Sequence, residues 1–83
     1  MIKVLIVEDS AVVREFLTYI LEAEPGIAVI GTATNGEEAI EFLKSKKPDV
    51  ITMDINMPKM DGFEATRRIM ETHPLLIVIV SGS

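Results

Sequence analysis

The 83-residue sequence contains no cysteine, so it offers no disulfide and no thiolate metal site, which suits a reducing compartment. It also lacks any apolar run approaching the roughly 20 residues that a membrane span needs. The opening "MIKVLIVEDS" has too short an apolar stretch for a signal peptide. These absences together predict a cytoplasmic location.

Basic side chains are in the minority, with 8 Lys and Arg against 13 Asp and Glu, which gives a formal net charge of −5. Such a balance does not favour binding to nucleic acid or to an anionic membrane, and it fits a cationic ligand better. The length predicts one domain covering residues 1–83, near the lower end of the size at which domains fold independently.

Apolar residues alternate between two kinds of pattern along the chain. Short β-branched runs, typical of strands buried in a parallel sheet, occupy residues 3–7, 27–33, 50–53 and 75–80. Helical periodicity begins at Ser10, Asn35 and Asp61, and extends to about residues 21, 46 and 70. The first helix places one apolar face along Val13, Phe16, Leu17, Ile20 and Leu21. Gly31 suits an edge strand or a bulge.

Four strands alternating with three helices predict right-handed crossovers and a parallel α/β sheet. The working site of such a sheet lies beyond the carboxyl ends of its strands. At those ends the sequence places a polar group after three of the four strands. They are Glu8 and Asp9 after the first strand, Asp54 after the third and Ser81 after the fourth.

Three carboxylates gathered at one sheet edge require either protonation or a cation. Mg²⁺ suits them, because it takes one or two carboxylates, a carbonyl and several waters. We expect Asp9 and Asp54 as direct ligands, the backbone carbonyl of Asn56 as a third, and Glu8 as an acceptor for a metal-bound water. A carboxylate beside Mg²⁺ is also able to attack a phosphoryl group.

Each of these residues alone has an ordinary structural interpretation. An acid pair after a strand often caps a helix, a single Asp after a strand is usually a cap, and Ser81 alone is an ordinary loop serine. The acid pair together with the segment "MDINMPKMDG" is harder to explain by capping.

Three segments, "VLIVEDS", "DVITMDINMPKMDG" and "IVIVSGS", resemble the site segments of response-regulator receiver domains in order and spacing. The amino-acid sequence of the second segment and of the predicted helix after it is most similar to receivers attached to chemotaxis methylesterases. The resemblance covers the whole chain. It implies a flavodoxin-like (CheY-like) parallel sheet in which the strands present here have the order 2-1-3-4.

The resemblance also assigns roles to individual residues. It makes Asp54 the phospho-acceptor, Glu8 and Asp9 the metal-binding acid pair, and Asn56 the carbonyl ligand of Mg²⁺. Ser81 becomes the hydroxyl that hydrogen-bonds the phosphoryl group and reports it by moving its loop. The phosphoryl donor becomes a phosphohistidine on a sensor histidine kinase, and the domain is a regulatory module rather than an enzyme.

The sequence departs from the receiver pattern after its fourth strand. A receiver continues through a fourth helix, a fifth strand ending in a lysine, and a fifth helix, and the sequence ends before all three. We therefore expect impaired phosphorylation, because the lysine charge is missing. We also expect Mg²⁺ to bind weakly. The edge of the last strand carries neither charge nor proline, which predicts a homodimer through that edge.

Three other functions compete with this interpretation. A Mg²⁺-dependent phosphatase with an aspartate nucleophile would have a D-x-D pair after its first strand. In this sequence the D-x-N pattern of Asp54 and Asn56 follows the third strand instead. A nucleotide-binding half of a doubly wound fold is disfavoured, because "GTATNG" lacks the required glycine spacing. A folding or assembly fragment whose site residues are inherited but idle remains open.

Overall fold

The computed structural model describes residues 1–57 and 60–80. Seven elements alternate along the chain. They are β1 (Ile2–Val7), α1 (Ala11–Glu22), β2 (Ile27–Ala33), α2 (Gly36–Phe42), β3 (Val50–Asp54), α3 (Gly62–Thr72) and β4 (Leu76–Val80). The predicted strands and helices are confirmed, with one clear difference in length: α2 ends at Phe42 instead of continuing to about residue 46.

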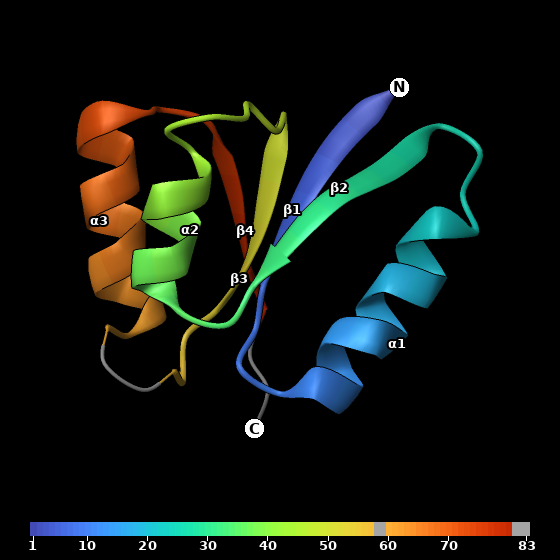
Figure 1. Cartoon of the computed structure of the whole chain (residues 1–83), viewed down its shortest axis with the longest axis horizontal. Coiled ribbons are helices and arrows are strands. Elements are labelled where there is room, and N and C mark those ends of the chain that lie inside the picture. The colour runs from blue at the N-terminus through green and yellow to red at the C-terminus, as the bar shows by residue number, and fades with distance from the viewer. Residues whose placement is uncertain (58–59, 81–83) are drawn as a thin grey trace.

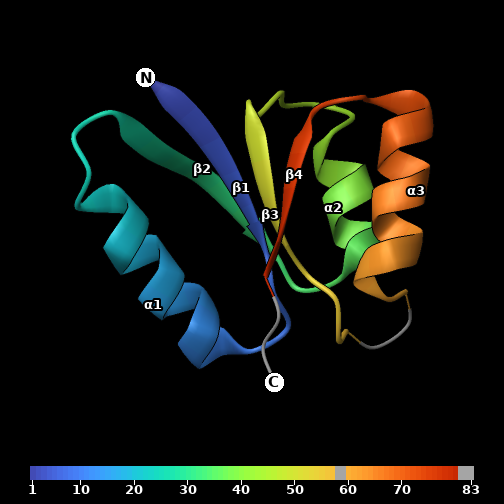
Figure 2. The ribbon, with the colours of Figure 1, turned by 180° about the vertical axis from the view of Figure 1, so that it is seen from behind.

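The four strands are parallel and form one sheet in the order β2-β1-β3-β4. This confirms the predicted fold class and strand order. The sheet is the middle layer of the molecule, with α1 on one face and α2 and α3 on the other (Figure 1). The opposite view shows the same layers, with β4 at the edge of the sheet away from β2 (Figure 2).

The hydrophobic core lies between the sheet and the α2–α3 layer. Its fully buried members include Leu5 of β1, Ile51 and Met53 of β3, and Ile69 of α3. The strand residues of this core alternate with residues that point to the opposite face of the sheet, as the period of two requires. Most of the burial that stabilises the fold is therefore on one side of the sheet.

Helix α1 differs from the other two helices, because none of its residues is buried. Its predicted apolar periodicity is correct, but Phe16 is 62% exposed and Ile20 is 44% exposed. The apolar face of α1 is therefore only partly covered by the described residues. The physical reason is geometric: α1 is the only described element on its side of the sheet, so its apolar stripe meets no second helix (Figure 1).

Local signals position the elements that carry the candidate site. The side chains of Ser10, Asn35 and Asp61 cap α1, α2 and α3 by accepting hydrogen bonds from the backbone N–H three residues on, at 3.3, 2.9 and 2.8 Å. β2 is an edge strand whose register with β1 shifts between Val29 and Gly31, so the expectation for Gly31 is confirmed. A side chain at Gly31 would collide with the ring of Phe42.

The exposed face of α3 carries a network of charged side chains. Glu64 accepts hydrogen bonds from Arg67 at 2.5 Å and from Arg68 at 2.9 Å, and Arg67 also contacts Glu71. Hydrogen bonds from Arg67 and then Arg68 lower the pKa of the Glu64 carboxyl from 4.5 to about 2.

This network predicts a specific titration. Because the pKa of Glu64 is lower in the folded than in the unfolded chain, its contribution to stability is present above pH 4.5 and is lost as pH falls towards 2. NMR titration of the side-chain carboxyls at low salt should place the pKa of Glu64 well below 4.5. The double substitution Arg67→Met and Arg68→Met should return the pKa of Glu64 towards 4.5. A pKa of Glu64 near 4.5 in the unchanged chain contradicts the network.

Candidate functional site

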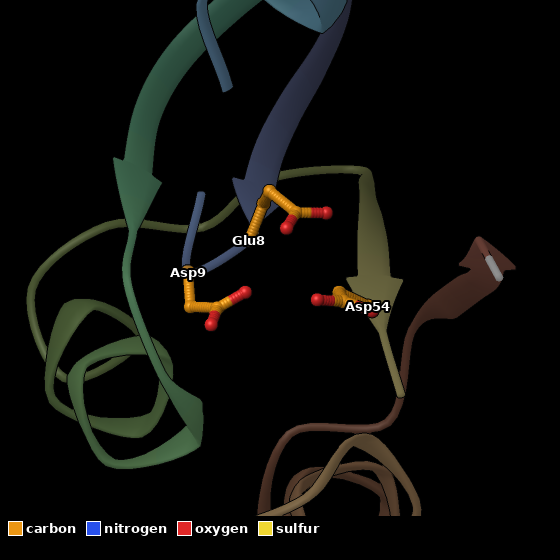
Figure 3. Close-up of side chains that lie close together, drawn as sticks. All are labelled: Glu8, Asp9 and Asp54. Atoms are coloured by element: carbon orange, nitrogen blue, oxygen red, sulfur yellow. The ribbon is translucent and has the colours of Figure 1, made fainter. Parts of the chain in front are cut away.

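The carboxyl ends of β1 and β3 bring the sequence-predicted acids together. The two strands are neighbours, and Val7 pairs with Met53, so the next residues along the chain, Glu8 and Asp54, lie side by side at this end of the sheet. Asp9 follows in the loop before α1, and the three side chains converge on one space (Figure 3). The Glu8 N–H donates to the carbonyl of Ala33 at 2.9 Å, which ties this end of β1 to the end of β2.

The three carboxylates are close enough to share one ion. Their nearest oxygens all lie within 4.8 Å of one another. Glu8 is 5% exposed and Asp54 is 4% exposed, whereas Asp9 is exposed. The site therefore has a buried floor and one acid at its open side.

The electrostatics of this cluster favour a bound cation. Burial raises the pKa of Glu8, the Ser10 N–H opposes this by hydrogen-bonding the carboxylate, and the neighbouring Asp54 raises it further. Within residues 1–57 and 60–80, the ion pairs are that of Glu41 with Lys44 and those of α3, and none joins a lysine or arginine to these three acids. No salt bridge among the described residues thus relieves the repulsion between the carboxylates.

Described residues that follow β3 turn back towards Asp54. The Asn56 N–H donates to Oδ1 of Asp54 at 3.1 Å, and the Gly62 N–H donates to the carbonyl of Ile55 at 3.2 Å. A cavity of about 550 Å³ opens here, and Asp9, Asn56 and Asp61 are among the residues that line it. Ser81 and Pro58 lie outside the described residues.

The positively charged side chain of Arg14 lies near the site and was not predicted from the sequence. Arg14 of α1 directs its guanidinium back at the β1–α1 loop, where Nη1 donates to the carbonyls of Glu8 at 2.8 Å and Asp9 at 3.1 Å. The available signal was its place one helical turn after Ser10, since long helical side chains point towards the helix N-terminus.

Comparison with known proteins agrees with the geometry. The response regulator receiver domain family matches residues 4–83. The chain is 68% identical over 83 residues to a protein-glutamate methylesterase/protein-glutamine glutaminase of Nitrosospira multiformis, covering 100% of this chain and 23% of that protein. It is 64% identical to a protein of the same name from Geobacter metallireducens, covering 100% of this chain and 24% of that protein. The chain thus spans about a quarter of these relatives.

Solved structures of similar chains show the same fold. The response regulator domain of Thermotoga maritima CheB superposes with a TM-score of 0.94 at 46% identity, covering 98% of this chain and 60% of that one. The CheX-CheY-BeF3-Mg+2 complex of Borrelia burgdorferi gives a TM-score of 0.91 at 39% identity, covering 99% of this chain and 63% of that one. Among the described helices of this chain, none is long and apolar enough to cross a membrane.

Proposed function

The chain belongs to the response regulator receiver domain family, and on that premise we propose that it accepts a phosphoryl group on Asp54 in two-component signalling. The observation that carries the proposal is the convergence of Glu8, Asp9 and Asp54 within 4.8 Å, with Asp54 buried at the end of β3. The donor is a phosphohistidine of a sensor histidine kinase. We propose that residues 1–83 act as one cytoplasmic regulatory domain.

The residues fit a Mg²⁺ ion, because they provide hard oxygen donors that repel one another without a cation. Asp9 and Asp54 would hold the ion directly with the carbonyl of Asn56, and Glu8 would accept a hydrogen bond from a metal-bound water. When bound, Mg²⁺ neutralises charge on the transferring phosphoryl group. The name of the Borrelia complex includes Mg+2 and BeF3, which supports this assignment by analogy.

The chain's own part in the transfer is nucleophilic attack. A carboxylate oxygen of Asp54 forms a bond to phosphorus while the phosphorus–nitrogen bond of the phosphohistidine breaks, and the electron pair leaves with the imidazole nitrogen. The product is an acyl phosphate on Asp54. The Asn56 N–H, bonded to Oδ1, holds the carboxylate in one orientation. In this proposal Ser81 hydrogen-bonds the phosphoryl group and moves with it.

Mass spectrometry after incubation with acetyl phosphate tests the proposal. We expect one phosphoryl adduct in the presence of Mg²⁺ and none in EDTA. Asp54→Asn should abolish it, while Asp49→Asn, which changes an exposed aspartate before β3, should not. We expect slow labelling, because no ion pair in the described part of the chain brings a cation to the three acids. An adduct that survives in Asp54→Asn rejects Asp54 as the acceptor.

The names of the relatives suggest the wider setting. We propose that the domain regulates a chemotaxis methylesterase of the kind named in the Nitrosospira and Geobacter relatives. The regulated activity belongs to the remaining three quarters of those proteins. The alternative is an assembly unit with an idle site, and it predicts no adduct under any of these conditions.

A homodimer through β4 is a second proposal, because a specific feature favours it. Within the described residues β4 pairs with β3 alone, and its Leu76, Val78 and Ile79 are 63%, 45% and 42% exposed. Apolar edge strands without charge or proline are sites of strand pairing between molecules.

The self-association of the 83-residue chain should be visible by light scattering over a dilution series into the low micromolar range. Ile79→Lys should shift the chain towards monomer. Val12→Lys, at a position 75% exposed on α1, should leave the dimer unchanged. A folded monomer at every concentration contradicts this proposal.

A further inference from the structure

The loop that carries Glu8 and Asp9 has backbone carbonyls outside the regular ladders of the sheet. Buried or partly buried carbonyls need hydrogen-bond donors. One side chain supplies them for both acids: Nη1 of Arg14 donates to the Glu8 carbonyl at 2.8 Å and to the Asp9 carbonyl at 3.1 Å. Arg14 is itself only partly exposed and lies on α1.

Fixing two successive carbonyls fixes the two peptide planes and so the directions in which the side chains of Glu8 and Asp9 leave the backbone. The same loop is bonded at Ser10, whose N–H donates to Glu8 Oε2 at 3.2 Å. A loop ordered before the ion arrives loses less conformational entropy on binding. Arg14 thus prepares the acid pair for its ligand.

The position of the charge matters as much as the hydrogen bonds. The guanidinium is bonded to the carbonyls and makes no ion pair with the three carboxylates in the described structure. Its positive charge therefore lies on the backbone of the loop and does not occupy the oxygens that a metal would use. Lysine has a single ammonium and lacks the rigid fork of donors that arginine presents.

We propose that Arg14 is a positioning residue that holds the β1–α1 loop in the shape required for Mg²⁺ binding. This inference rests on the proposed function for its metal, and on the two hydrogen bonds for its effect on the loop. Removing the side chain should weaken Mg²⁺ binding about tenfold, the lower end of the effect of residues that orient metal ligands.

The test compares Arg14→Met and Arg14→Lys with the unchanged 83-residue chain. Arg67→Met is the matched control, because Arg67 is an exposed arginine of α3 that bonds other side chains. Mg²⁺ affinity is measured by NMR titration. Amide hydrogen exchange is measured without metal at Ser10 and Val13, with the amides of β3 as the internal reference.

We expect Arg14→Met to raise the Mg²⁺ dissociation constant about tenfold and to speed exchange at Ser10 and Val13 at least fivefold relative to β3. Arg14→Lys should fall between Arg14→Met and the unchanged chain, and it carries the test if Arg14→Met does not fold. Arg67→Met should change neither quantity. Mg²⁺ affinity and exchange within twofold of the unchanged chain in both Arg14 variants overturn the inference.

The two readouts separate this inference from the proposed function. If the unchanged chain binds no Mg²⁺, the proposed metal site fails. In that case faster exchange at Ser10 in Arg14→Met still supports the loop-holding role, and unchanged exchange rejects it.

Discussion

Replacing Gly62 with alanine should destabilise the fold by about 3 kcal/mol, the upper part of the usual range for overpacking a close contact. Gly62 is the first residue of α3 and lies against the strand end that carries Asp54. An added Cβ would lie 2.6 Å from Cα of Ile55 and would collide with the carbonyl oxygen of Asp54. Both neighbours are backbone, so neither is able to rotate away.

The same substitution should also damage the site. Relief of the collision requires the chain after β3 to move away from α3, and that movement displaces Asp54 from the other two acids. We therefore expect any folded Gly62→Ala protein to lose the stabilisation that Mg²⁺ gives the unchanged chain.

Urea unfolding in EDTA and in millimolar Mg²⁺ measures both effects. Gly26→Ala is the matched control, because a Cβ there meets nothing within 4 Å. It should change the free energy of unfolding by less than about 0.5 kcal/mol. A Gly62→Ala protein as stable as the Gly26→Ala control would show that the contact with the Asp54 backbone is not tight.

The acidic site was largely predictable from sequence because it depends on topology. Parallel strands joined by helices end at the same edge, so acids directly after the first and third strands had to meet once those strands became neighbours. The strand order itself came from the resemblance. The periodicity of residues 3–7 and 50–53 alone gives no neighbour relation.

Other features depend on three-dimensional contacts that periodicity does not record. The apolar stripe of α1 predicts a helix, but whether Phe16 is buried depends on the elements beside it. Gly62 looks like any helix-start glycine until the backbone of Asp54 is seen against it. Arg14 looks like an ordinary helix charge until its guanidinium is seen on two loop carbonyls.

The largest expected gain in stability comes from neutralising one acid of the cluster. In the metal-free chain at pH 7, Glu8→Gln should raise the free energy of unfolding by about 1 kcal/mol, as removal of an unfavourable charge commonly does. Burial, with the nearby Asp54, raises the pKa of Glu8 above its ordinary value of 4.5. A carboxyl with a raised pKa in the folded state favours folding while it is protonated. Stability is then lost as pH rises from 4.5 through the folded pKa, and glutamine removes that loss.

Measuring the stability of Glu8→Gln at two pH values, in EDTA and in Mg²⁺, distinguishes the loss of an unfavourable charge from a change in side-chain packing. In EDTA the advantage of Glu8→Gln should disappear at pH values below 4.5, where Glu8 is protonated in both states of the unchanged chain. Mg²⁺ should stabilise the unchanged chain more than the variant, because the ion offsets the repulsion that glutamine has already removed and because Glu8 would hold a metal-bound water. Glu15→Gln, at an exposed position of α1, should leave stability nearly unchanged at either pH. A Glu8→Gln protein less stable than the unchanged chain in EDTA at pH 7 would mean that the buried Glu8 carboxylate stabilises the fold through its bond to Ser10 more than its charge opposes it.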